Sequence, residues 1–185
     1  IDFRTLEPSH YDSIMGTSTG AAVIFGATGG VMEAALRTAY ELVTGKPVPF
    51  NNLNITPVRG MEGVKEATVK IEGTTQEWRF LEGAELKVAI AHGLVNANKV
   101  AKAVSTGKAS YHFIEIMACP GGCIGGGGQP IPTNAAVRQK RMDAIYSEDM
   151  HMDLRKSHEN PEIKAIYEEF LEKPNGHKSH ELLHT

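Results

Sequence analysis

The spacing of apolar residues predicts several helices along the chain. The clearest covers residues 29–44, where apolar side chains recur every three or four positions. Thr28 fits an N-cap, and Gly45 fits the position just beyond the last helical turn. The same spacing, with Asn96 as an N-cap and Pro161 in a first turn, predicts helices over residues 96–105, 134–147 and 161–171.

Shorter apolar runs predict strands. Residues 64–71 alternate apolar and polar positions, and residues 86–91 and 111–116 form two further strands. Residues 73–83, which include the only tryptophan, Trp78, form a polar connection that indicates a hairpin. Two weaker signals are a buried strand or extended segment over residues 21–25 and a loop with a short strand over residues 52–59.

Strands and helices alternate in the middle of the chain, which predicts an α/β fold with a partly parallel sheet flanked by helices. A length of 185 residues suits one domain, so residues 1–185 are expected to form a single domain. The strand over residues 111–116 runs directly into a glycine-rich segment. Ligands of α/β sheets usually bind at the carboxyl ends of strands, so this segment is the first candidate site.

Composition excludes some functions. The chain has 19 Lys and Arg against 22 Asp and Glu without a basic stripe, so nucleic acid is not an expected partner. The most apolar run, residues 20–26, is too short to cross a bilayer, and no membrane association is expected. Two cysteines do not form a disulfide scaffold, and a cytoplasmic, reducing environment is the default. The first residue is Ile1 rather than Met, so the lack of a visible signal peptide carries little weight.

Both cysteines lie in the glycine-rich segment MACPGGCIGGGGQP, residues 117–130. Cys119 and Cys123 are separated by three residues, and the segment holds six of the 19 glycines of the chain. Ordering glycine costs conformational entropy. Such a segment is therefore expected to hold a ligand, or to let a ligand come close to the backbone, as an iron–sulfur cluster or another metal would require.

Several alternatives stay open from the residues alone. The segment could be a turn with incidental thiols or a small disulfide, although closing so short a loop gains little stability. A redox pair would have two residues between its cysteines, not three. Zinc could use Cys119 and Cys123 with the histidine pair His180 and His184. A 4Fe–4S cluster usually takes four thiolates, and this chain has only two.

A second glycine-rich motif, GATGGVME over residues 26–33, precedes the predicted long helix. Such a turn can bring a pyrophosphate to a helix N-terminus, as in dinucleotide-binding proteins. Those proteins also carry an acidic residue at the end of a strand about twenty residues later. Here the sequence KPVPF stands in that place, which disfavours NAD(P) binding.

Taken together, these motifs resemble one known family. The segment MACPGGCIGGGGQP resembles the last of the three cysteine signatures of the iron-only (FeFe) hydrogenases. The stretch GTSTGAAVIFGATGGVMEAALRTAYELVTGKPVP resembles the glycine-rich stretch that precedes that signature. RGMEGVKEATVKI and YHFIEIMACPGGC follow in the family's order, and LRKSHENPEI with HELLHT resembles its C-terminal end. The resemblance extends over nearly the whole chain.

The resemblance implies one lobe of a two-lobed α/β catalytic domain that holds the H-cluster. This cluster is a 4Fe–4S cubane joined to a di-iron unit that carries CO and cyanide. By the family's pattern, Cys119 ligates the cubane, and Cys123 ligates it and bridges to the di-iron unit. Met117 is implied to lie near this bridge. Phe25 and Val31 are implied to pack against the di-iron unit.

The family's two earlier cysteine signatures have no counterpart in this sequence. The resemblance therefore implies the C-terminal half of the domain, without a catalytic residue of its own and with an incomplete cluster site. The implied function is reversible H₂ oxidation and proton reduction, with the N-terminal half of the same domain and a ferredoxin-type electron carrier as partners. This chain alone is expected to be inactive. The alternative is a hydrogenase-like iron–sulfur assembly or sensory protein without H₂ turnover.

Overall fold

The computed structural model describes the chain except residues 11, 13–14, 50–58 and 185. The loop and short strand expected over residues 52–59 lie almost wholly outside the described residues. The chain divides into two compact units, Thr19–Glu159 and the combination of Ile1–Ser18 with Asn160–Thr185. The expectation of a single domain stays a prediction.

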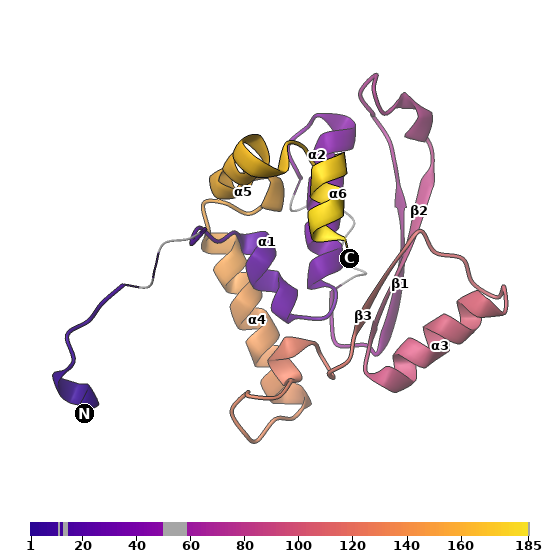
Figure 1. Cartoon of the computed structure of the whole chain (residues 1–185). Helices are drawn as coiled ribbons and strands as arrows, with labels where there is room; N and C mark the ends of the chain where they lie inside the picture. The colour runs from indigo at the N-terminus through magenta and orange to yellow at the C-terminus, as the bar shows by residue number, and fades with distance from the viewer. Residues whose placement is uncertain (11, 13–14, 50–58, 185) are drawn as a thin grey trace. The chain divides into compact units, whose positions relative to one another are not determined.

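The larger unit is built on a three-stranded mixed sheet (Figure 1). Strands β1 (Val64–Lys70), β2 (Glu85–His92) and β3 (Phe113–Met117) lie in the order β1-β2-β3. β1 is antiparallel to β2, and β2 is parallel to β3. The predicted partly parallel sheet is confirmed, and so is the hairpin, whose connection contains a short 3₁₀ helix at Arg79–Leu81.

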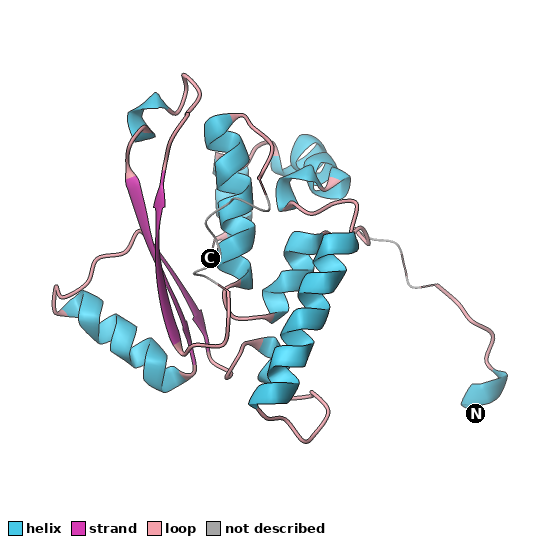
Figure 2. Ribbon diagram, turned by 180° about the vertical axis from the view of Figure 1, so that it is seen from behind, coloured by secondary structure: helices cyan, strands magenta, loops and turns pink. Residues whose placement is uncertain are grey.

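β2 is buried on both faces, and a helix covers each face (Figures 1 and 2). Val88 and Ile90 pack with Met32 and Leu36 of α2 (Gly30–Thr44). On the other face, Ala89 and Ala91 pack with Val100 of α3 (Leu94–Ser105). Alternate residues of a strand point to opposite faces, so four consecutive apolar residues supply both layers.

The apolar run over residues 21–25 is helical, so its prediction as a strand is wrong. It forms α1 (Gly20–Val23) and a 3₁₀ turn, η2 (Ile24–Gly26). Thr19 caps α1 by accepting a hydrogen bond from the Ala22 N–H. A short apolar run does not distinguish a buried strand from a buried helical turn, and here the cap and the packing of α1 against α4 decide.

Helix α4 (Ala135–His151) begins after Asn134, whose side chain accepts a hydrogen bond from the Val137 N–H, and it runs one turn further than predicted. Met142 packs with Ala27 and Ile124, which joins α4 to both glycine-rich segments. α3 also begins earlier than predicted, at Leu94. Asn96 is not its N-cap, because the Asn96 amide donates to the His92 carbonyl instead.

A network of buried ion pairs ties α2 to α4, and we call it the scaffold network. Arg37 donates to both oxygens of Asp149, at 2.6 and 2.7 Å, and to Glu33 at 2.6 Å. All three side chains have no solvent exposure. Arg155 also binds Asp149, and Arg59 binds Glu33. Burial raises the pKa of Asp149, but the hydrogen bonds from Arg37 and Arg155 outweigh burial and hold that pKa below its ordinary value.

The smaller unit contains α5 (Pro161–Ile166), which continues as a π-helical turn over Tyr167–Leu171, and α6 (His177–Leu183). Asn160 caps α5 and also donates to the Thr17 carbonyl. The helix predicted over residues 161–171 is therefore confirmed, whereas the sequence pattern did not predict α6. Over the residues described, no helix has the length and apolar character needed to span a membrane.

Candidate metal centre

The cysteine loop, residues 118–130, leaves the sheet at the carboxyl ends of the parallel strands β2 and β3. His92 and Met117 are paired in register at these ends, and the Gly93 N–H donates to the Met117 carbonyl at 2.8 Å. The hydrogen-bonded pairing of β2 with β3 therefore ends at Met117, and the loop departs from there. The loop lies where the sequence places the candidate site.

Around the two thiols the loop is a series of tight turns. The Gly122 N–H donates to the Cys119 carbonyl at 3.0 Å, and the Gly126 N–H donates to the Cys123 carbonyl at 3.0 Å. Gly121 and Gly122 have φ angles of +84° and +95°, a region that favours glycine. Two of the three residues between the cysteines are thus glycine because the backbone conformation requires it.

The cysteine loop packs backbone to backbone against the first glycine-rich segment. The Thr28 N–H donates to the Gly121 carbonyl at 3.0 Å. A Cβ atom on Gly122 would lie 2.7 Å from the Gly26 carbonyl oxygen and 2.8 Å from the Met117 sulfur. Any side chain at this position would separate the two segments, so the two glycine-rich motifs form one site.

Two buried charged residues of the sheet support the contact between the two glycine-rich segments. Glu115, on β3, accepts hydrogen bonds from the N–H groups of Gly29 at 2.6 Å and Met32 at 2.8 Å. Lys65, on β1, donates to the carbonyls of Thr28 at 3.1 Å and Gly60 at 2.9 Å. Both residues are 6% exposed. Burial lowers the pKa of Lys65 to about 8, even though the nearby Glu115 carboxylate acts to raise it.

At the start of the long helix, one expectation is wrong and one alternative that the sequence disfavoured does not fit. Thr28 is not the N-cap of α2; Gly29 holds that position with a left-handed backbone and no capping side chain. The Glu115 carboxylate accepts the hydrogen bonds of the buried Gly29 and Met32 N–H groups at this helix N-terminus. A pyrophosphate would need those same groups, so dinucleotide binding by GATGGVME does not fit.

Helix α4 contacts the cysteine loop through two arginine side chains. Arg141 donates to the carbonyls of Ile124 at 2.8 Å and Pro130 at 2.7 Å. The aliphatic stem of Arg138 packs against Gly121 and Gly125, where added Cβ atoms would lie 3.1 and 2.7 Å from its Cδ. The loop is therefore held by the sheet, by the Gly26–Gly30 turn and by α4.

The five predicted site residues lie on two segments in direct contact. Cys119 is partly buried, with its sulfur 3.4 Å from where a Cβ on Gly126 would lie, and Cys123 is exposed. Met117 is partly buried at the end of β3. Phe25, 44% exposed in η2, and Val31, in the first turn of α2, flank the Gly26–Gly30 turn. Their individual roles remain predictions.

The donor set fits part of an iron–sulfur site. Neither thiol is in a disulfide, and Gly126 presents no side chain to the Cys119 sulfur. Two thiolates are half of the usual set for a cubane. Within the described part of the chain, no group of three or more His, Cys, Asp or Glu side chains is arranged to hold a metal. The zinc alternative combines the thiols of the larger unit with His180 and His184 of the smaller unit, and it stays an alternative.

Sequence reasoning missed the polar residues behind the loop: Lys65, His92, Glu115, Arg138 and Arg141. A signal was present for two of them. Glu115 interrupts the apolar strand HFIEIM, and Lys65 occupies a buried position of an alternating strand. A charged residue at a position that the pattern buries indicates a partner, because burying an unpaired charge is costly. No sequence signal identified the partners.

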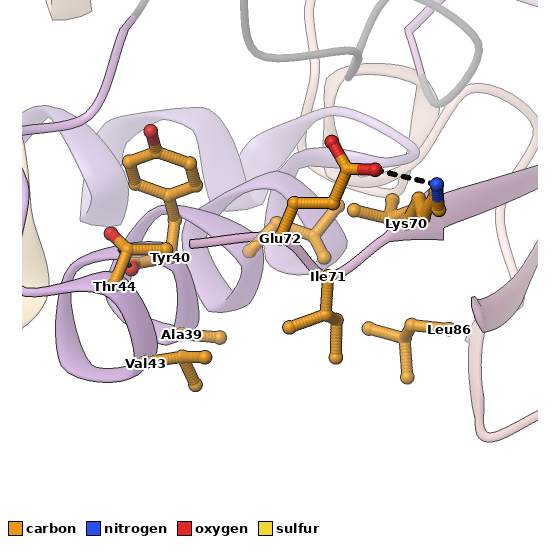
Figure 3. Close-up of a pocket in the computed structure, with 10 residues that line it drawn as sticks. Ala39, Tyr40, Val43, Thr44, Lys70, Ile71, Glu72 and Leu86 are labelled. Carbon is orange, nitrogen blue, oxygen red and sulfur yellow. Dashed lines mark hydrogen bonds and ion pairs between the residues drawn. The ribbon is translucent and has the colours of Figure 1, made fainter. Parts of the chain in front are cut away.

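A separate cavity of about 270 Å³ lies between the second half of α2 and the hairpin (Figure 3). Its wall is mostly apolar, with Ala39, Val43, Ile71 and Leu86 among the lining residues, and the Lys70–Glu72 ion pair lies at its edge. These residues lie toward the C-terminus of α2 and at the start of β2, whereas the cysteine loop lies at the N-terminus of α2 and the end of β2. This cavity is therefore not part of the cysteine site.

Comparison with known protein families identifies the family of this chain. The family model described as the iron only hydrogenase large subunit, C-terminal domain, matches residues 1–127, and that of the iron hydrogenase small subunit matches residues 135–185. The chain belongs to the family formed by the C-terminal domains of iron-only hydrogenase large subunits. The predicted family and α/β fold class are confirmed.

Individual relatives cover the whole chain. The NADP-reducing hydrogenase subunit HndD of Solidesulfovibrio fructosivorans is 50% identical over 100% of this chain and 30% of its own length. Iron hydrogenase 1 of Clostridium pasteurianum is 39% identical over 100% of this chain and 31% of its own length. Protein NAR1 of Arabidopsis thaliana is 30% identical over 100% of this chain and 38% of its own length.

Solved structures of FeFe hydrogenases also resemble this chain. The FeFe hydrogenase HydA1 from Chlamydomonas reinhardtii superposes with a TM-score of 0.72 and 44% identity, covering 98% of this chain and 50% of that one. A second FeFe hydrogenase structure, described in terms of oxygen damage to the 2Fe subcluster of its H cluster, matches with a TM-score of 0.72 and 46% identity. The chain thus spans 30% of the length of HndD and half of the length of these solved chains.

Proposed function

We propose that this chain forms the C-terminal half of the H-cluster domain of an FeFe hydrogenase. The complete enzyme would oxidise H₂ and reduce protons reversibly, exchanging electrons with a ferredoxin-type carrier. The observation that carries the proposal is the cysteine loop. Two free thiols, in a glycine turn held at the carboxyl end of a parallel strand pair, belong to a chain of the hydrogenase family.

Each predicted residue has a role in this proposal. Cys119 and Cys123 would bind the cubane as thiolates, and Cys123, the more exposed thiol, would also bridge to the di-iron unit. Met117, Phe25 and Val31 would form the apolar wall beside that unit. The bound H-cluster supplies the redox and hydrogen chemistry. The residues of this chain hold the thiolates in place and exclude water.

A second polypeptide segment is required, because a cubane needs two thiolates that this chain lacks. The N-terminal half of the same domain is the proposed source. Exposed apolar side chains near the end of β3 and the start of α3 support a covered surface there, since Ile116 is 50% exposed and Leu94 70%. A reducing, cytoplasmic environment would keep both thiols free for iron.

Alone, the chain should bind no intact H-cluster and evolve no hydrogen. Iron, acid-labile sulfide and H₂ should be measured on the purified 185-residue chain after reconstitution. Near-stoichiometric four-iron clusters with H₂ turnover would contradict the proposed need for a second segment.

The decisive test is a chimera in which this chain replaces the matching half of Chlamydomonas reinhardtii HydA1, produced in a host that matures HydA1. We expect infrared bands of CO and cyanide on iron, together with H₂ production. Cys123→Ser should abolish the bands, because a hard hydroxyl replaces a soft bridging thiolate. HydA1 is the positive control, and circular dichroism verifies that each chimera folds. A folded chimera whose Cys123→Ser variant keeps full bands and activity would refute the bridging role.

The second candidate is an iron–sulfur assembly protein without H₂ turnover. The similarity to NAR1 over the whole chain favours it, as does 42% identity to probable cytosolic Fe-S cluster assembly factors of Drosophila over about half the chain. The chimera separates the two candidates. A folded chimera that holds a cubane but shows neither CO and cyanide bands nor H₂ production would favour assembly over hydrogenase function.

A further inference from the structure

His92 connects the sheet to the cysteine loop. It is the last residue of β2 and is only 8% exposed. Its own backbone is fixed, since its N–H donates to the Gly63 carbonyl at 3.1 Å and its carbonyl accepts the Asn96 amide at 2.9 Å. The imidazole therefore projects from a rigid position at the edge of the sheet.

Both ring nitrogens of His92 have partners. The Gly121 N–H lies 3.0 Å from Nδ1, and the Met61 carbonyl oxygen lies 3.1 Å from Nε2. A backbone N–H can only donate, so Nδ1 must accept and cannot carry a proton. Nε2 then carries the proton and donates it to the carbonyl of Met61. The contacts thus select one neutral tautomer of the ring.

Gly121 is the middle one of the three residues between Cys119 and Cys123. Its N–H is held by His92 and its carbonyl by the Thr28 N–H. The Met61 methyl group closes the space where a side chain would project, 2.8 Å from an added Cβ. Hydrogen bonds on both sides of this residue therefore fix the turn that sets the separation of the two thiols.

We propose that His92 is a positioning residue for the metal centre, acting through the hydrogen bond from Gly121 to its Nδ1. The proposal rests on the proposed function in assigning Cys119 and Cys123 to a cluster. A buried N–H that loses its acceptor is costly, so without His92 the turn rotates and the thiols leave their binding geometry. A neutral acceptor suits this place, because a carboxylate would add negative charge beside two thiolates.

Two substitutions separate the two hydrogen bonds of the ring. In His92→Asn, Oδ1 is two bonds from Cβ, as Nδ1 is in histidine, so the acceptor for Gly121 remains while the donor to Met61 is lost. In His92→Gln, the amide nitrogen is three bonds from Cβ, as Nε2 is, so the donor remains while the acceptor is lost. Each variant loses one hydrogen bond, which makes them a matched pair for stability.

The first readout is amide hydrogen exchange of Gly121 in the 185-residue chain without iron, followed by NMR after selective ¹⁵N labelling of glycine. Relative to wild type, we expect roughly tenfold faster exchange in His92→Gln and less than about threefold in His92→Asn. Equal exchange in the two variants would overturn the proposal. Should the glutamine variant not fold, fast Gly121 exchange in folded His92→Asn would overturn it as well.

The second readout is the cluster in the HydA1 chimera. We expect His92→Asn to keep the iron content and the electron paramagnetic resonance spectrum of the cubane, and His92→Gln to lose iron or alter the spectrum. Identical spectra and iron contents in both variants would overturn the proposed role. If the unsubstituted chimera folds but binds no iron while Gly121 exchange behaves as expected, the proposed function fails, and the control of the turn by His92 stands.

Discussion

Helix α2 is anchored by one buried polar network at its N-terminus and by another along its length, and the two are built differently. The scaffold network joins side chain to side chain, with Arg37 between Glu33 and Asp149. The other, which we call the loop network, consists of Lys65, His92 and Glu115. Its members bind backbone groups of the Gly26–Gly30 turn, residues 60–61 and the cysteine loop.

This difference follows from what each network holds. Helices carry long side chains, so ion pairs can join α2 to α4. The glycines of these turns have no side chains to offer, so their N–H and carbonyl groups are held instead, by side chains that reach in from the sheet. Breaking the scaffold network should therefore lower the stability of the unit most, whereas breaking the loop network should lower it less and should also change the site.

The largest expected effect is that of Arg37→Met in the scaffold network. It leaves the buried carboxylates of Glu33 and Asp149 without their shared cation, which should lower the free energy of unfolding by about 3–5 kcal/mol. Urea unfolding of the cluster-free chain measures this. Lys70→Met is the matched control, since the Lys70–Glu72 pair is 61% and 64% exposed and should change stability by less than about 0.5 kcal/mol. A similar loss in both variants would show that burial does not set how much these ion pairs contribute to stability.

Lys65, in the loop network, should make the free energy of unfolding depend on pH. Between about pH 8 and its ordinary value of 10.5, the unfolded chain keeps a proton that folded Lys65 has lost. Raising the pH through this window therefore favours the folded state, by up to about 3 kcal/mol in total. The difference between wild type and Lys65→Met should show this rise, because the other groups that titrate there cancel. A constant difference from about pH 7 to about pH 11 would mean that Lys65 keeps an ordinary pKa.

Glu115→Gln should have a smaller effect on stability. The amide keeps one oxygen for either Gly29 or Met32 and presents an NH₂ group to the other N–H, and the negative charge at the helix N-terminus is lost. We expect a loss of about 1–2 kcal/mol in the free energy of unfolding, with faster exchange of the Gly29 and Met32 amides. If the amides of α2 instead exchange faster by the same factor along the whole helix, Glu115 stabilises the entire helix, as the scaffold network does.

The smallest effect is expected for Met117→Leu. The substitution keeps volume and apolar character beside Gly122, so stability should fall by less than about 1 kcal/mol. In the HydA1 chimera the CO and cyanide bands should stay, shifted at most slightly. Loss of those bands with unchanged stability would mean that the Met117 sulfur does more than fill space.

The sequence predicted the elements whose neighbours are close along the chain. The α2 helix, the β1–β2 hairpin and the three strands followed from periodicity, because burial of one face imposes a spacing of two or about 3.6 residues. Residues 21–25 were predicted wrongly because a short apolar run fits either element, and Thr19 decides for helix only through its cap. The thiols were also found, since their glycine-rich setting is unusual without a ligand.

The sequence by itself therefore determined the family, the sheet, four of the helices (α2, α3, α4 and α5) and the two segments that carry the candidate site. The tertiary structure alone decided that these segments meet through Thr28 and Gly121, and that Glu115, Lys65 and His92 hold them. These contacts join residues far apart in sequence, 29 positions for His92 and Gly121 and 86 for Glu115 and Gly29. They also depend on backbone groups, which are chemically the same at every residue. Only the folded chain shows which N–H or carbonyl a buried side chain reaches, because no residue type marks its own backbone as the partner.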